Sequence, residues 1–181
     1  MDRGIRIAKE LGYDGDVQTW KPVKERIKRE VLAKGWSLEK KAFTMYYGSK
    51  ELDAANLLMP LVRFLPANHP KVKATIERTK EELAEDGLLY RYKFPNGLES
   101  GEGAFTVCNF WLVDCLTKLG RLEEAKQLFE RLLGYANHLG LYSEEIDPST
   151  RELLGNFPQA YVHMGLINSA VHLDRALSKR R

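Results

Sequence analysis

The sequence predicts an all-α fold of helical hairpins in which inner and outer helices alternate. Apolar residues recur at spacings of three and four along most of the chain, which is the period of a helix and not that of a strand. Leucine followed by glycine closes three of these apolar blocks, at Gly12, Gly120 and Gly140, and a left-handed glycine is a common helix terminus. With 44% hydrophobic and 29% charged residues, the composition is that of an ordinary globular chain.

The apolar period predicts seven helices: residues 2–11, 17–34, 52–65, 69–85, 102–119, 122–139 and 158–177. The first two end at Gly12 and Gly35, and the second tolerates Pro22 only near its first turn. The third coincides with an apolar block. The fourth has Pro70 at an early position, and Gly87 is expected to supply its left-handed cap.

The last three helices follow the same logic. The fifth opens at Glu102 and ends at Gly120, the sixth ends at Gly140, and the seventh starts at Pro158. Two kinds of helix emerge. Segments 52–65, 104–119 and 160–173 are apolar nearly all round, whereas 17–34, 71–85 and 122–139 carry one apolar stripe. This alternation fits an α/α barrel or an α-solenoid, and the lack of a fixed repeat argues against tetratricopeptide or HEAT arrays.

Two long loops precede apolar helices, at residues 88–103 and 141–159, and both are rich in Gly, Pro, Asp and aromatic residues. Loops leading into the outer helices are short. Long loops gathered at one end of a helical scaffold predict a rim that faces a substrate. The second loop carries the paired carboxylates Glu144 and Glu145.

Charge and hydropathy exclude several classes of protein. The net charge of +3 comes from 28 basic and 25 acidic residues that are mostly interspersed, so we predict no nucleic-acid partner. The basic cluster at residues 177–181 is expected to be a solvated end. No apolar run approaches the roughly 20 residues that span a bilayer, and the N-terminus lacks a signal-peptide core, so we predict no membrane association.

The cysteines and histidines suggest no metal or cofactor. Cys108 and Cys115 lie on one face of a predicted helix, too far apart to pair, and are expected to be buried thiols in a reducing, cytoplasmic setting. The histidines sit at no ligand spacing. Phosphate-binding glycine loops, nucleophile elbows and C-x-x-C pairs are also missing.

Six motifs together resemble a known family. YRY, GEGAF, FWLVD, GRLEEA, SEEIDP and GNFPQA occur in that order within residues 88–171, and YGSKELDAANLLMPLVRFLP extends the likeness upstream toward residue 1. Their order and spacing resemble the C-terminal part of glycoside hydrolase family 15, the glucoamylases and their bacterial and archaeal trehalase-type relatives. The resemblance implies that residues 1–181 form one all-α domain, the C-terminal half of an (α/α)6 barrel. The N-terminal half, with the general acid, is absent.

The resemblance also implies site residues. Glu144 matches the general base of the family, and Glu145 is its neighbour or a substrate contact, with the choice of base between the two left open. Arg91 matches an arginine that binds sugar hydroxyls, a task that suits its rigid fork of donors. Tyr92 is a sugar platform or packs at the rim. Glu102 contacts a substrate hydroxyl or interacts with the dipole of the helix it opens.

These candidate site residues also have structural interpretations that involve no substrate. Both glutamates could be solvated loop carboxylates, and Arg91 could be a surface residue stacked on tyrosines. Asn156 either contacts sugar with its amide or caps the helix at Pro158. Other residues of segments that resemble the barrel lining are Tyr46, Tyr47, Trp111, Phe157, Gln159 and His163; we expect Trp111 in the core and His163 to be a satisfied core histidine.

The function implied by the resemblance is inverting hydrolysis of α-glucosidic bonds in maltooligosaccharides, starch or trehalose. The chain carries the general base but not the general acid, so it is expected to self-associate or to pair with a complementary N-terminal chain. Two alternatives remain: an inactive fragment or helical-hairpin binding module, and a sugar phosphorylase of a related α/α barrel.

Overall fold

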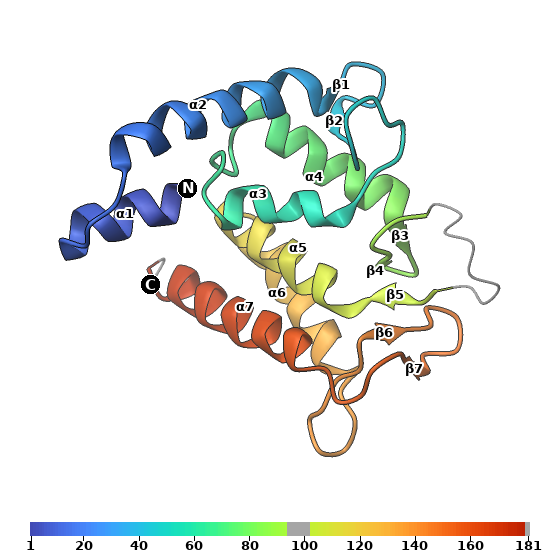
Figure 1. Cartoon of the computed structure of the whole chain (residues 1–181). Coiled ribbons are helices and arrows are strands. Elements are labelled where there is room, and N and C mark those ends of the chain that lie inside the picture. The colour runs from blue at the N-terminus through green and yellow to red at the C-terminus, as the bar shows by residue number, and fades with distance from the viewer. Residues whose placement is uncertain (94–101, 180–181) are drawn as a thin grey trace.

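The structure, a computed structural model, describes residues 1–93 and 102–179. It is mostly helical, as predicted (Figure 1). The helices are α1 Asp2–Leu11, α2 Val17–Lys34, a 3-10 turn Ala54–Leu57, α3 Leu58–Leu61, α4 Pro70–Leu83, α5 Thr106–Lys118, α6 Leu122–Leu133 and α7 Ala160–Ser178. Part of the predicted rim, residues 94–101, and Arg180 and Arg181 of the basic tail lie outside the described residues.

Short strands join the helices. They are β1 Trp36–Ser37, β2 Ala42–Phe43, β3 Ala84–Glu85, β4 Leu88–Leu89, β5 Ala104–Phe105, β6 Glu145–Ile146 and β7 Leu153–Leu154. β1–β2 and β3–β4 form antiparallel pairs, and β5, β6 and β7 form a three-stranded antiparallel sheet in that order. The apolar period did not predict these strands, because two residues are too few to establish an alternation.

Helix α5 is the centre of the core, with every residue from Thr106 to Leu116 buried. It packs against α6 and α7 (Figure 1). Small residues of α7 permit the close approach: a Cβ on Gly165 would lie 3.1 Å from Val107 Cγ2, and Ser169 Oγ donates to the carbonyl of Phe110 at 2.9 Å. The prediction of an apolar inner helix with buried Cys108 and Cys115 is confirmed.

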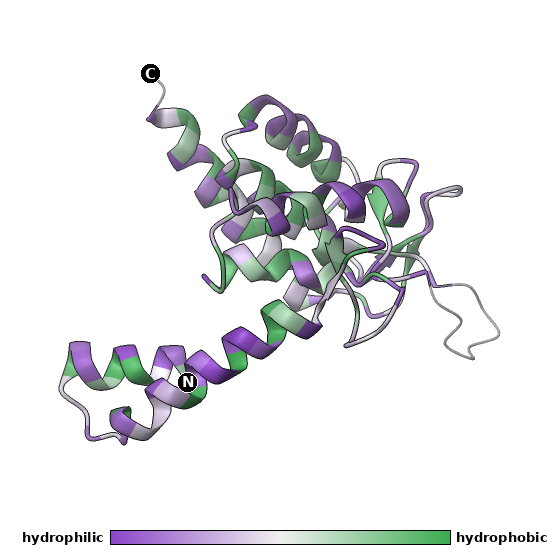
Figure 2. Cartoon of the chain, turned by 90° about the horizontal axis from the view of Figure 1, so that it is seen from above, coloured by the Kyte–Doolittle hydropathy of each residue, from purple (hydrophilic) through white to green (hydrophobic). Residues whose placement is uncertain are grey.

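The N-terminal hairpin of α1 and α2 is an outer element. Figure 2 shows it projecting from the rest of the chain. α2 contributes no buried residue and α1 only Ile5. An ion pair joins the two helices, with Lys24 Nζ 2.6 Å from Asp2 Oδ1. Among the helices of the described ranges, none combines the length and apolar character needed to cross a membrane.

The predicted third helix, residues 52–65, is wrong in extent. A 3-10 turn opens it at Ala54, with the Asp53 carboxylate accepting from the amide of Ala55 at 2.7 Å, and α3 ends at Leu61. Pro60 has no N–H to bond with the residue four positions earlier, which interrupts a continuous α-helix. Arg63, at a φ of +62°, then turns the chain away.

The predicted cap at Gly87 is also wrong. α4 ends at Leu83, and residues 84–85 pair with Leu88–Leu89 as a hairpin. Asp86 and Gly87, with φ of +43° and +69°, form its two-residue turn. Asp-Gly is a favoured pair for such turns, since both positions require positive φ.

Three further boundaries differ. Glu102 does not open a helix, because residues 104–105 pair with β6 and α5 begins only at Thr106. α6 ends at Leu133, and the Asn137 carboxamide accepts from the amides of Leu139 and Leu141, which stabilises a turn in place of two more helical turns. α7 begins at Ala160, not at Pro158.

Helix α7 is buried on one face only. Val162, Gly165, Ser169 and Leu173 face α5, whereas an apolar stripe of Tyr161, Met164, Ile167 and Val171 is exposed, with Ile167 at 60%. The expectation that residues 160–173 are buried all round is therefore wrong for this chain. The described residues supply a partner to only one side of the helix.

A buried carboxylate joins α5 to α7. Asp114 is almost fully buried, and its Oδ1 lies 2.9 Å from Nδ1 of the half-exposed His172. Burial raises the pKa of Asp114 above its ordinary value of 3.8, against the opposing effect of His172. The ionised form of Asp114 therefore costs folding free energy even with its partner in place.

We expect the stability of Asp114→Asn relative to the unaltered chain to increase as the pH rises from 3.8 through the higher folded-state pKa of Asp114. A carboxyl whose pKa is raised by folding contributes stability below its ordinary pKa of 3.8, and this is lost as the pH rises through the higher folded value. Urea unfolding at several pH values measures the difference. Asp174→Asn, on the exposed side of α7, is the control. A stability difference that does not change with pH would contradict the prediction.

Candidate active site

The five candidate site residues line one small pocket. Three segments far apart in the sequence supply them: Arg91 and Tyr92 follow β4, Glu102 precedes β5, and Glu144 and Glu145 lie at the start of β6. The pocket has a volume of about 180 Å³, and Gly103 and Phe105 complete its lining. Complete small-molecule sites are typically about 300–1,000 Å³, so the volume of this pocket is smaller than that of a typical complete site.

The β5–β6 pairing places the two glutamates. Ala104 pairs with Ile146, and Phe105 pairs with Glu145. The backbone of Glu144 is bonded on both sides: its carbonyl accepts from the amide of Thr106 at 2.9 Å, and its amide donates to the carbonyl of Asn156 at 3.0 Å. The loop that carries the paired carboxylates is therefore attached to the first residue of the buried helix α5.

The side chain of Glu144 is held through one oxygen. Its Oε2 accepts from the Asn156 side-chain amide at 2.7 Å and from the Asn156 backbone amide at 3.1 Å. None of the described residues hydrogen-bonds Oε1. Ordering a glutamate side chain costs about 1.5–2 kcal/mol of rotamer entropy, and a hydrogen bond to a charged group contributes about 1.5–3 kcal/mol. Two such bonds suffice to order the carboxylate.

Glu145 has a different environment. It is half-buried, and its Oε2 accepts from the amide of Gly103 at 2.9 Å. Burial raises the pKa of Glu145; the Gly103 bond opposes this, and the neighbouring carboxylates of Glu102 and Glu144 add to it. Of the two adjacent glutamates, Glu145 is thus the one whose surroundings favour the protonated form.

Arg91 is held by contacts with Asp53, Ala54 and Tyr92. Its Nε lies 3.6 Å from Asp53 Oδ1, its carbonyl accepts from the amide of Ala54 at 2.8 Å, and its guanidinium lies 5.7 Å from the centre of the Tyr92 ring. The side chain remains about half exposed. Its donors can therefore reach a ligand in the pocket. Asp53 was not among the predicted site residues, because nothing in the sequence relates it to Arg91.

Other candidates lie away from this pocket. Trp111 is buried, as expected, and makes an edge contact with Tyr161 at 6.0 Å. His163 is satisfied, as expected, by the carbonyl of Gln159 at 2.8 Å and the amide of Tyr142 at 3.4 Å. Tyr46, Tyr47 and Phe157 are exposed and do not line the pocket.

Of the two interpretations of Asn156, the cap of the last helix is wrong. Gln159 is the N-cap residue of α7, and its side-chain oxygen accepts from the amide of Tyr161 at 3.4 Å. Asn156 lies too far before the helix and bonds Glu144 instead. The motif GNFPQA drew attention to Asn156, but its partner is distant in sequence, so only the tertiary structure identifies it.

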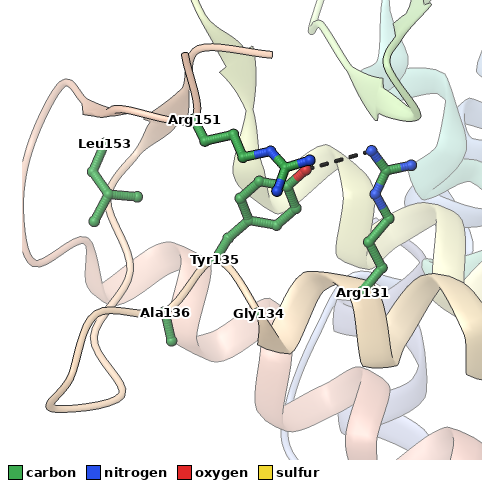
Figure 3. Close-up of a pocket in the computed structure, with 6 residues that line it drawn as sticks. All are labelled: Arg131, Gly134, Tyr135, Ala136, Arg151 and Leu153. Atoms are coloured by element: carbon green, nitrogen blue, oxygen red, sulfur yellow. Dashed lines mark hydrogen bonds between the residues drawn. The ribbon is translucent and has the colours of Figure 1, made fainter. Parts of the chain in front are cut away.

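Larger hollows occur elsewhere. One of about 390 Å³ is lined by Arg131, Gly134, Tyr135, Ala136, Arg151 and Leu153. Figure 3 shows the guanidinium groups of Arg131 and Arg151 on either side of Tyr135. Arg131 already binds the carbonyl of Asp86 and its carboxylate, the latter at 3.2 Å, so it tethers α6 to the β3–β4 turn. No candidate site residue lines this hollow. Within the described residues no cluster of His, Cys, Asp and Glu suits a metal ion.

Comparisons with known proteins agree on a family. The model described as "Glycosyl hydrolases family 15" matches residues 1–171. Trehalase from Thermoplasma volcanium is 45% identical over 99% of this chain, and trehalase from Mycolicibacterium smegmatis is 46% identical over 97%. A solved wild-type glycosidase superimposes over 94% of this chain with a TM-score of 0.79 at 17% identity, and a variant described as in complex with glucose does so equally well.

The relatives are much longer than this chain. The chain spans 29% of the Thermoplasma trehalase, 27% of the Mycolicibacterium trehalase and 48% of the solved glycosidase. The match to the glycosidase at 17% identity establishes the helical fold. That fold is consistent with part of a six-hairpin α/α barrel, as the sequence predicted.

We expect Gly155→Ala to destabilise the chain more than Gly140→Ala, by about 1 kcal/mol, the contribution of a typical hydrogen bond. Both glycines have positive φ, +71° and +76°, and each substitution incurs the left-handed penalty of roughly 1–2 kcal/mol. Only at Gly155 would the new Cβ press on Glu144, 3.0 Å from its Cβ and 3.1 Å from Oε2. Urea unfolding measures both variants, and equal losses would argue against the contact.

Proposed function

Because the chain belongs to glycosyl hydrolase family 15, we propose that it supplies the general-base side of an active site that hydrolyses an α-glucosidic bond with inversion. The observation that carries the proposal is the convergence of Arg91, Glu144 and Glu145 on one pocket with Tyr92 and Glu102. These residues come from three separate segments. A carboxylate pair with an arginine and an aromatic ring suits the binding and hydrolysis of a sugar.

Trehalose is the proposed substrate. The relatives that are 44–46% identical across nearly the whole chain are named trehalases, and trehalose consists of two glucose units joined through their anomeric carbons by an α,α bond. Maltooligosaccharides, which share the α-glucosyl group, are the comparison substrates. The part of the site that would bind the second sugar unit is not among the pocket residues.

In the proposed mechanism Glu144 is the general base. It removes a proton from a water molecule as the water oxygen attacks the anomeric carbon, while an acid protonates the departing oxygen. Both amide donors of Asn156 bind Oε2 of Glu144, and no described residue hydrogen-bonds Oε1, so Oε1 is assigned to the water. Glu145, whose raised pKa favours protonation, is assigned a substrate contact, as are Arg91, Tyr92 and Glu102.

The acid is proposed to come from residues outside this chain. Inverting sites hold acid and base roughly 6.5–9.5 Å apart with a water molecule between them, and among the described residues the other carboxylates that line the pocket are Glu102 and Glu145. The exposed stripe of α7 supports a missing partner, and the length of the relatives indicates its nature: further helices of the barrel.

The test is glucose release from trehalose, maltose and isomaltose. It uses this chain alone and this chain mixed with the part of Thermoplasma volcanium trehalase that it does not match. Release is expected in the mixture, with trehalose preferred. Glu144→Gln is expected to lower the rate by roughly 10²–10⁴-fold, the usual contribution of a general base, and Glu145→Gln by much less.

Three results would contradict the proposal. Full activity in Glu144→Gln with loss in Glu145→Gln would exchange the two roles. Glucose 1-phosphate formed only in phosphate buffer would indicate a phosphorylase. A mixture that assembles, as judged by light scattering, yet releases no sugar would favour a binding module.

We expect the chain by itself to self-associate through the α7 stripe, since large exposed apolar patches promote association. Met164→Lys with Ile167→Lys places two charges on the stripe, where the native side chains are 59% and 60% exposed, and is expected to yield monomers in concentration-dependent light scattering. Leu38→Lys, at a residue outside α7 that is 85% exposed, is the control. A monomeric unaltered chain at high concentration would count against this expectation.

A further inference from the structure

We infer that Asn156 is a positioning residue, whose side chain and backbone together hold Glu144 in the orientation needed to activate water. The inference rests on the proposed function, because it concerns how that base works. It assigns Asn156 neither to the sugar nor to the helix terminus, the two roles that its sequence context suggested.

Three hydrogen bonds join Asn156 to Glu144. Its side-chain amide donates to Glu144 Oε2 at 2.7 Å, its backbone amide donates to the same oxygen at 3.1 Å, and its carbonyl accepts from the Glu144 amide at 3.0 Å. Three polar groups of one residue thus bind one other residue. A surface asparagine that merely solvates a loop has no reason to direct all three groups to the same neighbour.

The surrounding backbone fixes this arrangement. Gly155, with a φ of +71°, lies against the Glu144 side chain, where an added Cβ would be 3.0 Å from the Glu144 Cβ. Beyond Asn156, the amide of Gln159 donates to the carbonyl of Tyr142 at 2.9 Å, so the chain returns to the segment that carries Glu144. The segment 156–159 is therefore attached to the segment 142–144 at two points, Asn156 and Gln159.

The two carboxylate oxygens of Glu144 differ in their hydrogen bonds, and this difference indicates which oxygen accepts the proton. Both donors of Asn156 bind Oε2, and no described residue bonds Oε1. Oε1 is left to accept the proton of the attacking water. As the water O–H bond breaks, the new C–O bond forms at the anomeric carbon, and the electron pair of the cleaved bond leaves with the oxygen that the acid protonates. Each turnover consumes one water molecule; the proton on Glu144 then passes to solvent, and the acid takes a proton from solvent, so both groups return to their starting states.

Because Glu144 is only half-buried, packing alone does not order its side chain. A base displaced by as little as 1 Å can lose about 10²-fold in rate. Loss of Asn156 is therefore expected to affect the chemical step far more than substrate binding. This separates a positioning residue from one that binds sugar, whose loss raises KM.

The test compares Asn156→Ala, Asn156→Asp and the control Asn168→Ala in the mixture with the trehalase segment. Asn168 is an exposed asparagine on α7. We expect Asn156→Ala to lower kcat for trehalose about 10- to 100-fold with little change in KM. Asn156→Asp, which puts a second carboxylate against Oε2, is expected to be at least as damaging. In the Glu144→Gln background, Asn156→Ala should cause no further loss, since it acts only through Glu144.

A second measurement is independent of activity. In the chain alone, NMR order parameters of the Glu144 side-chain carbons are expected to fall in Asn156→Ala and to stay unchanged in Asn168→Ala. Unchanged order in Asn156→Ala overturns the inference. So does a kcat that is unaffected by Asn156→Ala while Glu144→Gln abolishes activity. An active Glu144→Gln variant instead overturns the proposed function.

Discussion

The structure depends on the short antiparallel pairing of β5 with β6. Four residues are involved, with Ala104 opposite Ile146 and Phe105 opposite Glu145. The ladder continues into helix α5 through the bond from the amide of Thr106 to the carbonyl of Glu144. Since α5 is the buried centre of the core, this pairing transmits the rigidity of the helix to a loop of acidic residues. Without it, the two glutamates would lie on a long loop with no defined relation to Arg91.

Glu144 and Glu145 are adjacent in the sequence, but the residues around them give them different properties. Glu145 is paired in the sheet, its carboxylate receives one backbone amide, and burial raises its pKa. Glu144 receives two donors on a single oxygen from Asn156. The sequence Glu-Glu does not distinguish the pair, whereas the hydrogen bonds do. Two neighbouring residues of the same type therefore have different hydrogen-bond partners in one pocket.

The site is bordered by surfaces that the chain leaves uncovered. The pocket is small, one face of α7 is apolar and exposed, and the α1–α2 hairpin extends from the body with little buried surface (Figure 2). The chain spans under a third of the length of the two trehalases. An inner helix of an α/α barrel needs neighbours on both sides, and α7 has them on one.

The sequence by itself determined the helical class, the left-handed glycines that follow two of the helices at Gly12 and Gly120, the buried character of α5, and a family likeness that made Arg91 and Glu144 candidate site residues. Such features are local, because the helical period and glycine turns depend on residues a few positions apart. Only the tertiary structure decided the rest. The pairing of β5 with β6, the anchoring of Arg91 by Asp53 and the partnership of Asn156 with Glu144 all depend on contacts between segments that are separated in the sequence. The spacing of apolar residues along the sequence does not reveal such contacts.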